Sequence, residues 1–176
     1  MYSPREDSDL LVKEVKKFAY GKVLDMGTGM GIQALAAAAK TEVSEVLAAD
    51  IDEDSLDYCI NSIKNEKITF KKSNLFSKIK GKFDTIIFNP PYLPQDKGIA
   101  DKALYGGKKG YETLERFFSK AGDHLEKGGI ILVIFSSLTN NNEVNEIIKR
   151  KGFNFKLLAK QHFFFDDLFV YLIKKK

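Results

Sequence analysis

The sequence has few of the residues that disulfide bonds and zinc sites require. Its 176 residues include one cysteine, Cys59, and two histidines, His124 and His162. A single cysteine excludes an internal disulfide, and these three residues do not have zinc-site spacing. We therefore expect no metal site and, from the cysteine usage, a reducing cytoplasm as the location.

Long apolar runs and a strong excess of charge are also missing. No stretch approaches the ~20 apolar residues that a membrane helix needs, and the polar opening MYSPREDSD is unlike a secretory signal. We expect no membrane association. A net charge of +4 fits a lysine-rich solvated surface and only weakly favours an acidic partner or nucleic acid. The length suits one domain, residues 1–176.

Short apolar stretches alternate with helical patterns along most of the chain. The patterns predict strands at 22–27, 45–50, 68–74, 83–88 and 130–137, and helices at 7–18, 32–40, 52–65, 111–125 and 143–150, with Gly128-Gly129 ending the fourth helix. Two further strands, 153–160 and 168–176, follow each other directly. This predicts an α/β fold with a doubly wound, mostly parallel seven-stranded sheet, helices on both faces and a C-terminal antiparallel hairpin at one edge.

Glycines and acidic residues follow the first two predicted strands. The first strand leads into DMGTGMG (25–31), and the second ends in Asp50, 25 residues after Asp25. Alternate glycines let the backbone turn sharply and approach a ligand, and an acid in this position accepts hydrogen bonds from ribose hydroxyls. These residues predict a nucleoside-cofactor site, but alone they do not distinguish nicotinamide or flavin from other cofactors. Asn74, after the third strand, could pair with adenine or simply form a turn.

The fourth predicted strand ends in the unusual segment FNPPYLP (88–94). Two adjacent prolines fix two φ angles and remove two backbone donors, so the corner is stiff and presents free carbonyls. The Asn89 side-chain oxygen and the Pro90 carbonyl could each accept one hydrogen of a planar NH2 group, while Tyr92 stacks on that group. This arrangement predicts transfer to an amide or base nitrogen, driven by positioning rather than by a general base.

Several segments together resemble a known family. DMGTGMG, AADID (48–52), SNLF (73–76) and FNPPYLP are similar to class I methyltransferases that use S-adenosylmethionine, and the Asn-Pro-Pro-Tyr motif is typical of the branch that methylates adenine, guanine or glutamine nitrogens. YSPREDSDLL (2–11) and YGGKKGYE (105–112) resemble HemK-related release-factor glutamine methyltransferases. The early position of the first segment resembles the short archaeal and eukaryotic form, without a helical N-terminal domain.

The resemblance implies a Rossmann-like methyltransferase fold and a role for each matched residue. Cofactor-binding residues would be Asp25, Gly27, Gly29, Asp50, Asn74 and Asn89, with Asn74 standing where the family more often has Asp. Catalytic residues would be Asn89, Pro90 and Tyr92, and substrate-binding residues Tyr2, Glu6, Ser8, Asn89, Pro91 and Tyr92. Pro4 and Asp7 would either cover the site or shape and cap the first helix.

The resemblance also implies partners. The substrate would be the glutamine of the Gly-Gly-Gln loop in a class I peptide chain release factor. A small zinc-binding activator protein would add a strand along residues 68–74, where Ile68 and Phe70 share a face and Lys71 and Lys72 could instead protect the edge. The alternative substrate is adenine N6 or guanine N2 of RNA or DNA, which would suit the basic residues Lys97, Lys102, Lys108 and Lys109.

Overall fold

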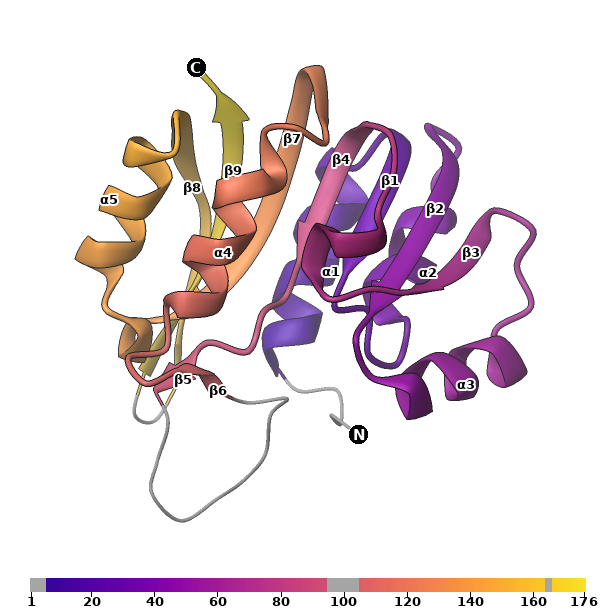
Figure 1. Ribbon diagram of the computed structural model, residues 1–176, viewed down its shortest axis with the longest axis horizontal. Coiled ribbons are helices and arrows are strands. Elements are labelled where there is room, and N and C mark those ends of the chain that lie inside the picture. The colour runs from indigo at the N-terminus through magenta and orange to yellow at the C-terminus, as the bar shows by residue number, and fades with distance from the viewer. Residues whose placement is uncertain (1–5, 95–104, 164–165) are drawn as a thin grey trace.

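One mixed sheet organises the protein. The computed structural model describes residues 6–94, 105–163 and 166–176 (Figure 1). In this part of the chain the main sheet has the order β3-β2-β1-β4-β7-β9-β8. Its strands are β1 Gly21–Met26, β2 Val43–Asp50, β3 Ile68–Lys72, β4 Phe83–Phe88, β7 Leu125–Ser136, β8 Phe153–Phe163 and β9 Asp166–Lys175.

The pairing confirms the predicted fold class. β1 pairs in parallel with β2 and β4, β2 with β3, and β4 with β7. β9 runs antiparallel between β7 and β8, so the last two strands form the predicted hairpin at one edge. Because β1, β2, β3, β4 and β7 are parallel, their carboxyl ends lie at one edge of the sheet, where ligands bind in open α/β folds.

Helices cover both faces of the sheet (Figure 1). α4 (Glu112–Ala121) and α5 (Asn141–Arg150) pack on the near face, and α1 (Glu6–Phe18) and α2 (Ile32–Ala38) lie behind it. α3 (Glu53–Ser62) connects β2 to β3. No helix of the described residues is long and apolar enough to cross a membrane.

Aromatic packing fixes the end of β4. Phe88, the last residue of this strand, is 1% exposed and its ring stacks on Phe117 of α4 at 4.4 Å between centroids. Phe117 in turn contacts Phe76 and Phe118 at 5.2 and 5.1 Å. Burying a Phe side chain contributes about 1.5–3 kcal/mol of stability. Packing of Phe88 therefore fixes the end of β4, from which residues 89–92 continue.

The predicted helix at 111–125 was too long, and Gly128-Gly129 does not end it. α4 ends at Ala121, and β7 already begins at Leu125, which is buried and pairs with Phe83. The register of β4 and β7 shifts between Phe83 and Thr85, and Gly128 has φ +84°. Burial of Leu125 against the sheet outweighs its helical pattern, and the glycines form an irregularity inside the strand.

The segment between β4 and α4 contains two short strands. β5 (Leu93–Pro94) pairs in parallel with β6 (Tyr105–Gly107) as a separate two-stranded sheet. In Figure 1 this pair lies at the lower side of the main sheet, as do the N-terminal end of α1 and helix α3. Segments distant in sequence therefore lie along the carboxyl edge of the parallel strands.

Candidate active site

The glycine turn after β1 leaves its backbone open to a ligand. Gly27 and Gly29 have φ +67° and +52°, a region that favours glycine. Gly27 N and Thr28 N donate to the Ala49 carbonyl at 2.7 and 3.0 Å, which ties the turn to β2. A Cβ on Gly29 would meet no other residue's atoms within 4 Å. Close approach of a cofactor to this backbone is therefore compatible with the structure.

The buried Asp25 carboxylate fixes the glycine turn through hydrogen bonds. Its side chain is 1% exposed, and Oδ2 accepts hydrogen bonds from Thr28 Oγ1 at 2.6 Å and Ala34 N at 3.0 Å. Burial raises the pKa of this carboxyl from 3.8 to about 7; the bonds from Thr28 and Ala34 act in the opposite direction, and nearby Asp50 adds to the increase. The structure thus assigns Asp25 a role in joining β1 to α2, and cofactor binding by Asp25 stays a prediction.

Asp50 ends β2 with a fixed carboxylate. Oδ2 accepts from Gly29 N at 2.8 Å and Oδ1 from Asp52 N at 2.9 Å, so the side chain lies beside the glycine turn. An ionised carboxylate has about four acceptor positions. Two backbone bonds leave acceptor capacity for ribose hydroxyls, and the residues present therefore fit a nucleoside cofactor.

Asn74 follows β3. Its side chain has a hydrogen-bond partner that local sequence patterns do not predict. Asn74 Oδ1 accepts a hydrogen bond from Arg116 Nη2 of α4 at 3.0 Å. Arg116 is 42 residues away in sequence, and no motif marks it. An adenine contact through Asn74 stays a prediction, and Arg116 would influence which amide atom faces the ring.

Asp7 joins the amide corner at residues 89–92. Its carboxylate Oδ2 accepts from the Tyr92 hydroxyl at 3.0 Å and from Asn89 Nδ2 at 3.4 Å. Asp7 is 3% exposed and lies in the first turn of α1, which begins at Glu6, so Asp7 does not precede and cap this helix as one interpretation had it. Asn89 and Tyr92 are half-buried, and Pro90 is buried.

The two oxygens expected to grip an NH2 group remain available. Within the described residues, no donor is bonded to Asn89 Oδ1 or to the Pro90 carbonyl. Thr139 Oγ1 donates to the Tyr92 carbonyl at 2.7 Å, and Tyr92 is therefore held at both its backbone and its hydroxyl. This geometry is compatible with the predicted acceptor pair.

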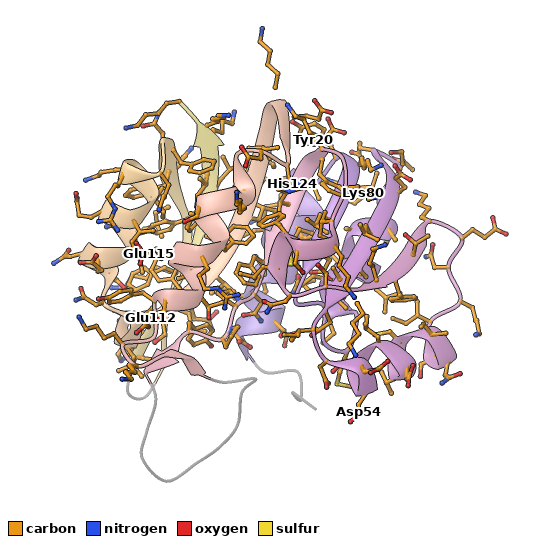
Figure 2. All side chains as sticks on the ribbon, viewed as in Figure 1. Tyr20, Asp54, Lys80, Glu112, Glu115 and His124 are labelled. Atoms are coloured by element: carbon orange, nitrogen blue, oxygen red, sulfur yellow. The ribbon has the colours of Figure 1, made fainter. Side chains whose placement is uncertain are left out.

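The glycine-rich segment after the corner packs directly against it. A Cβ on Gly106 would lie 2.5 Å from the Pro91 carbonyl oxygen and 2.1 Å from that of Gly110. Glu112, which Figure 2 labels at the start of α4, accepts from Lys109 N through both carboxylate oxygens. The segment therefore braces the proline corner.

The remaining predicted residues are placed less directly. Tyr2 and Pro4, like Lys97 and Lys102, lie outside the described residues, as does the Glu6 side chain. Ser8 is 4% exposed, and its carbonyl accepts from Gln33 Nε2 at 3.0 Å. Binding of substrate by Tyr2, Glu6 and Ser8 stays a prediction.

Comparison with known proteins identifies the family. The model of the Methyltransferase small domain family matches residues 6–165. A Methanocaldococcus jannaschii protein, provisionally named protein N5-glutamine methyltransferase, is 36% identical, with 97% of this chain and 89% of the relative covered. The release factor glutamine methyltransferase of Deinococcus radiodurans is 30% identical over 74% of this chain, which spans about half (52%) of that relative.

A solved structure shows the same fold. The E. cuniculi Mtq2–Trm112 complex, described as responsible for methylation of the eRF1 translation termination factor, superposes with a TM-score of 0.79 at 20% identity, covering 99% of this chain and 98% of the other.

The chain belongs to the Methyltransferase small domain family. It is a methyltransferase that depends on S-adenosylmethionine, related to the protein N5-glutamine methyltransferases. The resemblance carried by the Asn-Pro-Pro-Tyr motif and the glycine turn is thereby confirmed.

Proposed function

We propose that this enzyme methylates N5 of the glutamine in the Gly-Gly-Gln loop of a class I peptide chain release factor. The observation that carries the proposal is the relative at 36% identity, which shares nearly the full length of the chain. The amide corner supports it, because two acceptors that receive no hydrogen bond from the described residues, on a proline-stiffened turn, suit a planar NH2 group.

The residues of the corner would act by holding the acceptor nitrogen. S-adenosylmethionine supplies a methyl group on a positively charged sulfur. Asn89 Oδ1 and the Pro90 carbonyl would each accept one N–H, drawing the nitrogen lone pair out of conjugation and stabilising positive charge as it develops, as an oxyanion hole does for negative charge. The nitrogen would gain the methyl group as that group's bond to sulfur breaks, the electron pair of this bond staying on sulfur, and would then release one hydrogen as a proton to water.

The cofactor would be held on the other side of the same edge. Asp50 would accept from the ribose hydroxyls, the backbone at Gly27 and Gly29 would follow the methionine part beside Asp25, and Asn74 would face adenine. Tyr92 would set the face that the acceptor amide presents. All these residues lie at or just after the carboxyl ends of β1 to β4, which supports a single methyltransferase domain over residues 1–176.

A small zinc-binding activator is the partner that we propose for the free edge of the sheet. β3 pairs only with β2 in the described sheet, so its other edge is available for an added strand. Ile68 and Phe70 pack toward the core, and Lys71 and Lys72 are exposed. A partner would therefore bind the β3 backbone rather than these apolar side chains. The exposed lysines would not prevent such backbone pairing. The Mtq2–Trm112 complex is a precedent for an enzyme of this fold bound to a second protein.

The test compares acceptors. The enzyme, with and without the activator, is incubated with cofactor labelled in its methyl group and with release factor, RNA or DNA separately. We expect label on the release factor, at the Gly-Gly-Gln glutamine by mass spectrometry, which would also agree with a cytoplasmic location. Label on nucleic acid alone would replace this proposal by base amino methylation.

A further inference from the structure

Asp7 connects the first helix to the amide corner across 82 residues of sequence. One oxygen of its carboxylate, Oδ2, is shared by the Tyr92 hydroxyl and the Asn89 side-chain nitrogen. The other oxygen, Oδ1, accepts from Ser8 N at 2.7 Å. A nearly inaccessible carboxylate thus lies behind both side chains that the proposed reaction uses.

We propose that Asp7 is a positioning residue that fixes the orientation of the Asn89 amide; this rests on the proposed transfer to an NH2 group. A carboxylate can only accept hydrogen bonds, and an asparagine amide has one accepting and one donating end. Asp7 therefore selects the orientation with Nδ2 toward itself, which directs Oδ1 toward the acceptor side. The flipped amide would present N–H groups to the substrate N–H groups.

The support of Asp7 is itself rigid. Leu11 and Val15 of α1 are fully buried, and Gln33 of α2 donates to the Ser8 carbonyl. Asp7 cannot follow a movement of Asn89 without displacing this packed helix. The same contact fixes the Tyr92 hydroxyl, so one residue sets both the amide orientation and the ring position.

The first test measures the orientation of the Asn89 amide without relying on enzymatic activity. In nuclear magnetic resonance spectra of 15N-labelled protein, the Asn89 side-chain NH2 should show slowed hydrogen exchange and a shifted proton resonance. The signal is assigned by its disappearance in Asn89→Ala. Asp7→Asn should move the signal to free-amide values, because the new carboxamide no longer selects one orientation. Asp9→Asn, at an exposed position of the same helix, is the matched control and should leave it unchanged.

The second test is methyl transfer to the release factor. Asp7→Asn should lower kcat by up to about 100-fold, the scale for misplaced reacting groups, with the KM for cofactor and the melting temperature close to those of Asp9→Asn. Asn89→Asp alone places two carboxylates against each other. The exchanged pair Asp7→Asn/Asn89→Asp should recover about tenfold over Asn89→Asp, as coupled neighbours do.

The outcomes separate the two proposals. An unchanged Asn89 signal in Asp7→Asn, or an exchanged pair less active than both single variants, would overturn the positioning role. If the wild-type enzyme methylated no release factor, the proposed substrate would be wrong, while the Asn89 signal would still decide the role of Asp7.

Discussion

Replacing Gly106 by alanine tests whether the glycine-rich segment supports the amide corner. Gly106 does not have positive φ, so an alanine is compatible with its backbone conformation. The added Cβ would nevertheless lie 2.5 Å from the Pro91 oxygen and 2.1 Å from the Gly110 oxygen, and both obstacles are backbone atoms. Neither can rotate away as a flexible side chain could, and the corner itself must move.

The expected magnitude follows from these distances. Restoring an ordinary contact of about 3.5 Å requires roughly 1 Å of displacement, shared between the two segments. Such overpacking costs about 1–3 kcal/mol of stability, and a misplacement of this size at a reacting group can lower turnover by about 100-fold. Because Asp50 and the glycine turn belong to other segments, cofactor affinity should change less than turnover.

The assay combines single-turnover methyl transfer with calorimetric titration of adenosylhomocysteine. Gly122→Ala is the matched control, because the atoms nearest to its Cβ would be those of the Phe153 and Lys175 side chains, at 3.5 Å or more. We expect a large loss of rate in Gly106→Ala and little change in Gly122→Ala. Wild-type turnover in Gly106→Ala would refute the argument that this segment braces residues 89–92.

Three further changes test other parts of the site. Thr139→Val removes the donor to the Tyr92 carbonyl and should cost about 1–3 kcal/mol of unfolding free energy, measured by denaturation; an unchanged midpoint would contradict it. Asp50→Ala should weaken cofactor binding by about 1–3 kcal/mol, and an unchanged dissociation constant by calorimetry would remove Asp50 from the site. Because the pKa of Asp25 rises from 3.8 to about 7 on folding, wild-type protein should lose stability relative to Asp25→Asn as pH rises from 4 to 7, by up to about 4 kcal/mol, and no more above it. Parallel stability curves of the two proteins would contradict the raised pKa.

Local patterns were sufficient for the fold because the strands are short apolar runs separated by helical patterns. They failed at residues 122–129, where Leu125 suits a helix face and a buried strand equally well. Pairing with Phe83, a contact between distant segments, decides for the strand. The glycine pair then forms a strand irregularity, which sequence alone does not distinguish from a helix end.

The candidate site was also predictable only in part, with local motifs recognisable and contacts between distant segments not. The glycine turn and the proline corner are recognisable because each is a continuous segment with unusual backbone requirements. The contacts of Asp7 with Asn89 and of Arg116 with Asn74 join segments 82 and 42 residues apart. Their hydrogen bonds depend on how the helices pack on the sheet, and local spacing carries no information about that packing.

The central claim is that the Asn89 side-chain oxygen holds the acceptor nitrogen beside the methyl donor. The most direct measurement is the single-turnover rate of Asn89→Ala at saturating cofactor, with the acceptor that the wild-type enzyme labels. Loss of a preorganised polar contact of this kind lowers rates by about 10²- to 10³-fold, and we expect a loss at least that large. A rate equal to that of the wild-type enzyme would contradict the claim.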